Sequence, residues 1–226
     1  MHKNDFTGIK EISTDKYLKW DYYQKIIGYL KDKDVLDVGC LDDGTSGANE
    51  VRWWNHWFLY SVCKSVVGID VREKQINQLR KMGLNVKKMD AQNIKFKQKF
   101  DIVFAGELIE HLPNPGQFLV SAANSLAKNG RIILSTPNTF SLSRLVRVFQ
   151  KISNEPNVNP DHTMYFSPQN IITLANKCHL NVMKIEYAHF PFSHFSLLIE
   201  LNKIGCKIMG ERFKEQMIVH VVKVKQ

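Results

Sequence analysis

The sequence predicts an α/β fold in which a seven-stranded, mostly parallel sheet carries helices on both faces. The first observation is that short apolar runs alternate along the chain with segments of helical period. The second is that two of these runs, 35–39 and 66–70, end in a glycine and an acid, as buried parallel strands do beside a ligand crevice. Right-handed crossovers between parallel strands place helices on both faces of such a sheet.

Each element is assigned from its period and from the breakers around it. We expect the strands at 35–39, 65–70, 84–88, 100–104, 131–135, 181–187 and 216–224. We expect helices at 15–30, 47–63, 72–82, 113–127 and 167–178. Two further segments, 139–166 and 188–214, exceed the minimal fold and follow the fifth and sixth strands, on the side where a crevice opens. We expect these two segments to face the substrate.

The whole chain, 1–226, is expected to form a single domain. A chain of 226 residues with 44% hydrophobic and 23% charged residues is typical of a soluble globular protein with a sizeable core. Its first residues lack an apolar signal region, and no apolar run approaches the roughly 18 residues that span a bilayer. The four cysteines, Cys40, Cys63, Cys178 and Cys206, stand alone rather than in C-x-x-C pairs, which favours the cytoplasm.

The net charge of +9 raises the question of an anionic partner. Most lysines are explained by solvated helix faces and loops, and no basic motif is interleaved with aromatic residues, so a nucleic-acid partner is the less favoured interpretation. Arg144 and Arg147 either reach an anionic substrate or form the basic face of an amphipathic helix. The sequence does not indicate an oligomeric state.

The ends of the first two strands predict a cofactor site. An acid at Asp70 suits a ribose diol, because a carboxylate accepts hydrogen bonds from two hydroxyls. A dinucleotide would need further glycines after Gly39, but Leu41 and Asp43 stand there, and two acids would repel a pyrophosphate. S-adenosylmethionine carries no phosphate, and its ammonium group is attracted by acids such as Asp37.

Two further segments resemble the class I S-adenosylmethionine-dependent methyltransferases. They are Lys99-Phe100-Asp101-Ile102-Val103-Phe104-Ala105-Gly106-Glu107-Leu108-Ile109-Glu110-His111-Leu112-Pro113-Asn114-Pro115 and Asn129-Gly130-Arg131-Ile132-Ile133-Leu134-Ser135-Thr136-Pro137-Asn138. The likeness is to the subgroup with E-x-x-E-H-L-x-x-P after the fourth strand, which includes ubiquinone-biosynthesis and other small-molecule O-methyltransferases. It covers residues 33 to 188 and implies a Rossmann-like sheet whose last strand, 216–224, is antiparallel. The chain departs from the family's D-x-G-x-G-x-G loop, because only Asp37 and Gly39 match in register.

The resemblance assigns the cofactor contacts to the ends of the first four strands. They are Asp37, Gly39 and Cys40 for the methionine part, Asp70 and Val71 for the ribose, Asp90 and Ala91 for the adenine, and Gly106 and Glu107 beside the sulfonium. Structural roles compete with these: Asp37 as a turn former, Asp70 as the N-cap of the next helix, and Asp90 in an Asx turn.

The chemistry is expected from Glu107, Glu110, His111 and the later His162. In one interpretation His111 or His162, beside Glu107, takes the proton of an attacking hydroxyl, because imidazole titrates near neutral pH. In a second, the two glutamates and two histidines bind a divalent metal, as in the small-RNA 2′-O-methyltransferases with E-x-x-E-H. In a third, Glu110 and His111 brace the turn before Pro113. The first interpretation is favoured, so no metal is predicted.

The sequence therefore predicts a methyltransferase that uses S-adenosylmethionine to methylate a hydroxyl of a small molecule or a glycan precursor. Catalysis would consist mainly of alignment and removal of the hydroxyl proton. RNA 2′-O-methylation with a divalent metal is the alternative within the enzyme class. A non-catalytic protein that keeps the fold is a further alternative, because the loop after Gly39 departs from the family pattern.

Overall fold

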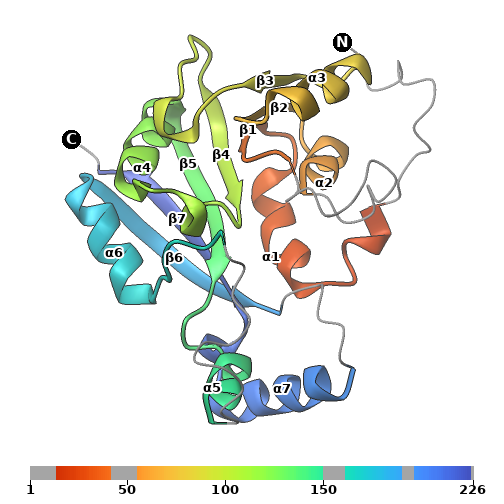
Figure 1. Cartoon of the computed structure of the whole chain (residues 1–226), viewed down its shortest axis with the longest axis vertical. Helices are drawn as coiled ribbons and strands as arrows, with labels where there is room; N and C mark the ends of the chain where they lie inside the picture. The colour runs from red at the N-terminus through yellow and green to blue at the C-terminus, as the bar shows by residue number, and fades with distance from the viewer. Residues whose placement is uncertain (1–13, 42–54, 150–160, 190–195, 225–226) are drawn as a thin grey trace.

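The computed structural model describes residues 14–41, 55–149, 161–189 and 196–224, and its centre is one seven-stranded sheet with the order β3-β2-β1-β4-β5-β7-β6 (Figure 1). The strands are β1 (Asp34–Val38), β2 (Ser65–Asp70), β3 (Val86–Lys88), β4 (Phe100–Gly106), β5 (Leu126–Pro137), β6 (Leu180–Ala188) and β7 (Gln216–Lys223). β1 pairs in parallel with β2 and β4, whereas β7 lies antiparallel between β5 and β6. The predicted fold class, with its antiparallel last strand, is confirmed.

Helices cover both faces of the sheet (Figure 1). On one face lie α4 (Pro115–Asn124) and α6 (Pro168–Lys177), which bury Phe118 and Ile171 against the strands. On the other face lie α1 (Asp21–Leu30), α2 (Asn55–Val62) and α3 (Glu73–Lys81). The apolar stripe of α1 includes Tyr23 and Ile26, which pack against Phe58 of α2 and the inner strands. Burial of these apolar faces supplies most of the driving force for folding.

Two additional helices lie beyond the carboxyl ends of β4 and β5, where Figure 1 shows α5 (Leu142–Phe149) beside α7 (Ser196–Met209). They belong to the two predicted substrate-facing segments. Short 3-10 turns complete the described structure: η1 (Thr14–Lys16), η3 (Ala91–Asn93), η4 (Ile109–His111) and η5 (Glu211–Phe213). Among the described residues, no helix combines the length and the apolar character needed to cross a membrane.

Several element boundaries differ from those predicted. The first helix begins at Asp21 rather than Asp15, because Trp20 has an extended backbone and occupies the N-cap position, which separates α1 from the turn η1. The helix predicted at 113–127 begins only at Pro115, where the side chain of Asn114 caps the backbone N–H of Gln117 and proline occupies the first turn. It also ends at Asn124, because Leu126 already pairs with Phe100 in the sheet.

Most strands differ from the prediction by one or two residues at an end, whereas β5 differs by more. β5 extends over Leu126–Pro137 instead of 131–135, with a register irregularity opposite Phe100 and Ile102. β4 continues to Gly106, so the segment predicted to follow the strand is still paired with Ser135. β3 begins at Val86 rather than at residue 84. The helix predicted at 47–63 is described from Asn55, and residues 47–54 lie outside the described part of the chain.

Candidate active site

The turn after β1 is tight and requires glycine. Gly39 has a φ of +74°, and its backbone N–H and that of Cys40 both donate to the carbonyl of Ile69, at 2.9 and 3.0 Å. A Cβ at Gly39 would lie 2.9 Å from the side chain of Leu108, so the turn also packs closely against the segment after β4. Glycine adopts a positive φ without steric cost. The chain is thus held where the ends of β1, β2 and β4 meet.

Asp37 has a structural partner that the sequence did not reveal. One of its carboxylate oxygens lies 2.8 Å from Nδ1 of His56 on α2, and both side chains are buried. Cys40 is buried as well, and its sulfur would touch a Cβ added at Gly68. Burial raises the pKa of the Cys40 thiol, which keeps it protonated. The side chains of Asp37 and Cys40 therefore face the protein interior, and their predicted contact with the methionine part stays a prediction.

Asp70 ends β2 and is held by Arg72, a residue not singled out from the sequence. Oδ1 of Asp70 accepts from the backbone N–H of Arg72 at 3.0 Å and from its Nε at 3.1 Å, and Arg72 Nη2 donates to the carbonyl of Leu41 at 2.8 Å. Asp70 thus braces the start of α3, although Arg72 itself occupies the N-cap position. A carboxylate has about four lone-pair sites, so Asp70 can still accept ribose hydroxyls. The neighbouring Val71 is 59% exposed, an apolar surface beside that acid.

Asp90 occupies the turn after β3. Its side chain accepts from the backbone N–H of Gln92 at 2.8 Å and caps η3, as an Asx turn does. Ala91 is buried at the start of η3. The predicted Asx turn is therefore present at Asp90. The predicted contact with the adenine can use only the carboxylate lone pairs that this hydrogen bond leaves free.

These strand ends suit S-adenosylmethionine chemically. Asp70 ends β2 and is followed by the exposed Val71, and Asp90 follows the neighbouring strand β3. The close turn at Gly39 lies beside them, after β1. At Gly106 an added Cβ would lie 2.8 Å from Asn55 Nδ2 and 3.1 Å from the Phe104 ring, so these side chains pack closely against the backbone there. The edge thus offers hydroxyl acceptors, an apolar face and close backbone approach, and these residues would hold the ribose, the adenine and the sulfonium end.

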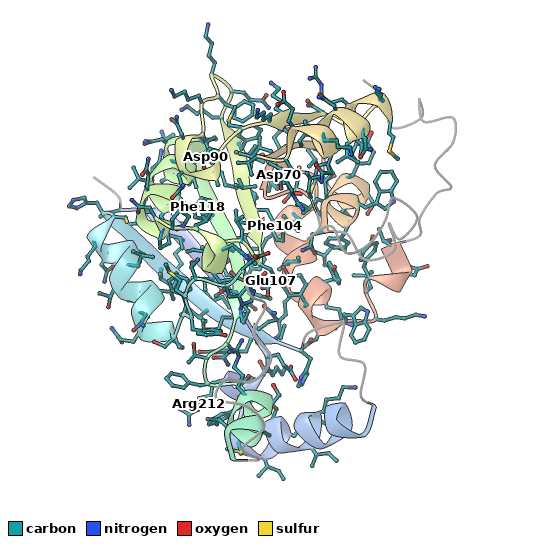
Figure 2. The ribbon with its side chains drawn as sticks, viewed as in Figure 1. Asp70, Asp90, Phe104, Glu107, Phe118 and Arg212 are labelled. Carbon is teal, nitrogen blue, oxygen red and sulfur yellow. The ribbon has the colours of Figure 1, made fainter. Side chains whose placement is uncertain are left out.

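Glu107 directly follows β4 (Figure 2) and is held by two other side chains. Its φ of +51° is unusual for a residue other than glycine, and such conformations persist at functional sites. Ser135 donates to one carboxyl oxygen at 3.1 Å, and Gln216 donates to the other at 3.0 Å. The hydroxyl of Tyr22 donates in turn to Ser135 at 3.1 Å. Burial raises the pKa of Glu107 to about 7, although these hydrogen bonds oppose the rise.

Glu110 is fully buried in η4 and interacts with Glu107. The two carboxyl groups are close enough for each to shift the pKa of the other, and Thr136 donates to Glu110 Oε2 at 3.0 Å. Oε1 of Glu110 is buried without a hydrogen-bond partner. Burial, and secondarily the charge of Glu107, raise the pKa of Glu110 well above its ordinary value. The backbone carbonyl of Glu110 accepts from Thr163, which fastens the segment 161–166 to η4.

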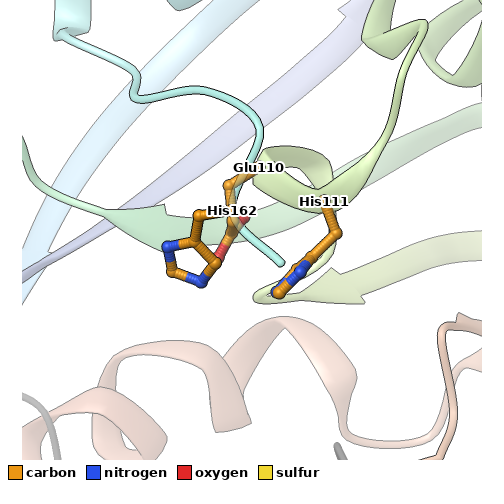
Figure 3. A group of neighbouring side chains, drawn as sticks. All are labelled: Glu110, His111 and His162. Carbon is orange, nitrogen blue, oxygen red and sulfur yellow. The ribbon is translucent and has the colours of Figure 1, made fainter. Parts of the chain in front are cut away.

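That fastening brings His162 to His111, as the sequence predicted for a shared site. The two rings lie 4.6 Å apart in an edge-to-face arrangement, and Nδ1 of His111 lies 3.2 Å from the carbonyl of Asp161. Figure 3 shows Glu110 and the two imidazoles gathered at one point. One potential ligand atom from each of the three residues lies within 4.8 Å of the others, close enough for one metal ion to contact all three.

Three residues in the hydrogen-bond network around Glu107 were not predicted from the sequence as site residues. They are Tyr22, Ser135 and Gln216. Ser135 could have been predicted, because it is a polar residue at the end of the apolar strand expected at 131–135. Nothing in the local sequence around Tyr22 or Gln216 indicates a contact with Glu107 or its neighbour.

The fold and the site define a class I methyltransferase, through the order of the strands and the ligand edge at the ends of β1 to β4. Comparison with known proteins agrees with this class: residues 17–185 match the family described as a methyltransferase domain. The chain belongs to this family. The predicted family, fold class and methyltransferase activity are thereby confirmed, and S-adenosylmethionine is the cofactor that the family and fold indicate.

Relatives and solved structures extend over most of the chain. A ubiquinone biosynthesis O-methyltransferase of Photobacterium profundum is 22% identical over 218 residues, covering 92% of this chain and 84% of that protein. A SAM-dependent methyltransferase from Archaeoglobus fulgidus has a TM-score of 0.57 at 20% identity, with 94% and 95% coverage. The magnesium protoporphyrin IX methyltransferase of Synechocystis PCC 6803, solved with bound SAH, has a TM-score of 0.56 at 13% identity, with 93% and 82% coverage.

Proposed function

We propose that this methyltransferase methylates a hydroxyl oxygen of a small molecule or a glycan precursor. The observation that carries the proposal is the cluster of Glu110, His111 and His162 just beyond the end of β4. Glu110 in turn interacts electrostatically with Glu107. A relative named as a ubiquinone biosynthesis O-methyltransferase supports an oxygen acceptor. When bound, S-adenosylmethionine supplies a methyl group activated by its sulfonium.

The residues of the chain would align the acceptor and receive its proton. Glu107 is held from two sides by Ser135 and Gln216, so its carboxyl group presents a fixed direction to a hydroxyl. His111 or His162 would accept the hydroxyl proton, because each carries a half-buried imidazole at the same point. Alignment is expected to contribute most, since holding two reactants in contact removes several kcal/mol of an entropic barrier, about 7–11 kcal/mol in well-oriented cases.

Calorimetric titration with S-adenosylhomocysteine tests the cofactor site, with NAD as the comparison ligand. We expect micromolar binding of S-adenosylhomocysteine that Asp70→Ala abolishes and Asp70→Asn weakens, because the ribose loses its charged acceptor. Glu73→Gln is the matched control, since Glu73 is an exposed acid on the neighbouring α3. Binding of NAD instead, or no heat with S-adenosylhomocysteine, would reject the cofactor assignment. Positive binding leads to an acceptor screen with labelled cofactor.

A second candidate is metal-assisted methylation, with an RNA 2′-hydroxyl as one acceptor class. The specific observation is the cluster of Glu110, His111 and His162, together with the buried Glu110 Oε1 that has no hydrogen-bond partner. These residues, with Glu107 beside them, would hold a divalent cation, which would lower the pKa of a bound hydroxyl. Carboxylate and imidazole donors together suit several divalent metals.

Chelation separates the two candidates. If the acceptor hydroxyl depends on a metal, activity disappears with chelator, returns with Mg²⁺ or Mn²⁺, and is lost in His162→Ala. Titration of the protein with Mn²⁺ gives a readout independent of activity, and His179→Asn, which changes an exposed histidine, is the control. Activity that survives exhaustive chelation supports the metal-free proposal. The acceptor screen includes short single-stranded RNA beside small hydroxyl compounds.

The proposed location is a reducing compartment such as the cytoplasm. No disulfide joins any of the four cysteines, all of which lie in the described parts of the chain. Unpaired cysteines are usual in reducing compartments.

A further inference from the structure

Arg144 lies in the first substrate-facing segment, at the start of α5, and its side chain is half-buried. Its guanidinium carbon lies 4.4 Å from the centre of the Tyr165 ring, so the planar group stacks over the aromatic face. Stacking of this kind favours arginine over lysine, because the guanidinium is flat and weakly hydrated. The stack fixes the direction of the side chain before any ligand arrives.

The guanidinium of Arg144 makes no ion pair or side-chain hydrogen bond to any residue in the described parts of the chain. Arg72 provides the contrast, because its guanidinium donates to Asp70 and to the Leu41 carbonyl. Arg144 nevertheless lies near the reaction centre, since its charge helps to lower the pKa of Glu107. A half-buried guanidinium whose five donors have no acceptor among the described residues is free to donate to a ligand.

Tyr165 connects Arg144 to the histidines. Its ring centre lies 6.3 Å from that of His162, and its hydroxyl is buried without a hydrogen-bond partner. One wall of the site thus carries, in sequence, an imidazole, an unsatisfied phenol and a stacked guanidinium. An anionic group with several acceptor oxygens would satisfy the last two together.

We propose that Arg144, held on the ring of Tyr165, binds a carboxylate or phosphate of the methyl acceptor, so that the substrate is an anionic hydroxyl compound. This inference rests on the proposed function, because it concerns the acceptor side of the same site. A solvated basic helix face would explain an arginine that projects into water. It does not explain one that is half-buried, stacked on the ring of Tyr165 and close enough to affect the pKa of Glu107.

The test uses two matched probe pairs on protein saturated with S-adenosylhomocysteine: 3,4-dihydroxybenzoate with catechol, and glycerol 3-phosphate with glycerol. Within each pair the members differ chiefly in the anion, so calorimetry measures the preference for it. We expect at least one anion to bind about tenfold or more tightly than its neutral partner, the size of a charge-assisted hydrogen bond. The pair that shows the preference distinguishes a carboxylate from a phosphate.

The ratio of the affinity for the anion to that for its neutral partner is expected to fall to about one in Arg144→Gln. It is expected to be partly kept in Arg144→Lys, which retains the charge but not the planar donors. Arg80→Gln, which removes an exposed arginine on α3, is expected to leave it unchanged. Equal or undetectable binding of both members of both pairs to the native protein would overturn the inference, as would a preference that survives Arg144→Gln. The initial titration with S-adenosylhomocysteine reports separately on the proposed function, because its failure removes the methyltransferase site itself.

Discussion

At the scale of single residues, Gly39 shows how a local conformation positions the cofactor edge. Its φ of +74° places the turn after β1 against Ile69 and Leu108. An L-residue in this conformation pays roughly 1–2 kcal/mol. We therefore expect Gly39→Ala to lower the free energy of unfolding by about that amount and to weaken cofactor binding. Urea denaturation and calorimetry measure the two effects.

Gly28→Ala is the matched control for this prediction. Gly28 lies exposed within α1, and an added Cβ would meet no atom within 4 Å. The same chemical change is expected to stabilise the protein there by up to about 1 kcal/mol, because alanine favours the helix. If the two substitutions change stability in the same direction, the role given to the backbone of Gly39 is wrong.

Ser135 links Glu107 to Tyr22 and predicts energetic coupling. It accepts a hydrogen bond from Tyr22 and donates one to Glu107, so Ser135→Ala leaves both groups without that partner. A buried polar group left unsatisfied costs about 1–3 kcal/mol. We expect Ser135→Ala to lower stability within this range and to reduce methyl transfer, because the Glu107 carboxyl group loses one of its two restraints.

A double-mutant cycle tests the link. Tyr22→Phe removes the hydroxyl that donates to Ser135 and keeps the aromatic ring in the core. In the double variant the second substitution is expected to cost less than it does alone, because the shared hydrogen bond is already absent. Strictly additive losses in unfolding free energy would show that the chain of hydrogen bonds has no energetic role.

At the scale of elements, Asn138 joins the two substrate-facing segments to the sheet. Its buried side chain donates to the carbonyls of Arg212 and Lys214 at 2.8 and 2.7 Å, and its backbone bridges to Phe166. Asn138, directly after β5, thus ties the segments that carry α5 and α7 to the sheet, in addition to the contacts Thr139–Phe166 and Lys214–Asp21. We expect Asn138→Ala to destabilise the protein by about 1–3 kcal/mol, as lost buried hydrogen bonds do.

The same substitution is expected to affect the acceptor more than the cofactor. The predicted cofactor contacts lie at the ends of β1 to β4, whereas Asn138 follows β5 and holds the segment before β7. Affinity for S-adenosylhomocysteine should change little, while amide exchange in residues 196–214 should accelerate. Asn138→Asp, which keeps the side-chain acceptor for Phe140 but not the donors, separates the two functions of this residue. Unchanged exchange in both variants would contradict the assigned role.

Element boundaries were predictable only where a local signal decided them. All seven strands were located. For β1, β2 and β4 the signal was an apolar run, because a buried parallel strand is apolar on both faces. The ends were less accurate. β5 begins at Leu126 because of pairing with Phe100 on another strand, and the start of α1 depends on the backbone of Trp20. Neither signal is present in the sequence near those residues.

At the scale of the whole molecule, the site depends on the order of the strands. Glu107 was found from its motif, but its partners Ser135 and Gln216 lie 28 and 109 residues further along the chain. They reach Glu107 because β4, β5 and β7 are neighbours in the sheet. In the same way, His111 and His162 meet because Thr163 binds the carbonyl of Glu110. Contacts of this kind follow from topology, which local periodicity does not determine.

The packing of α1 over the far strands also predicts how stability varies with pH. His220 of β7 is 1% exposed, its Nε2 lies 3.0 Å from Glu186, and its ring packs against Tyr29 of α1. Nδ1 is buried without a hydrogen-bond partner, so protonation there would place a second N–H where no acceptor lies. Burial lowers the pKa of His220 below its ordinary value of 6.5, despite the opposing effect of Glu186.

Because the folded state binds this proton less readily than the unfolded state, the free energy of unfolding is expected to fall as the pH drops through about 6.5, by at most about 1.4 kcal/mol per pH unit. Urea denaturation at pH 7.5, 6.5 and 5.5 measures the slope, and His220→Gln should reduce it, since glutamine donates to Glu186 without titrating. His179→Asn is the control, because His179 is exposed and its positive φ suits asparagine. Equal slopes for the native protein and His220→Gln would show that another group controls stability in this range, and that the buried imidazole is accommodated in both protonation states.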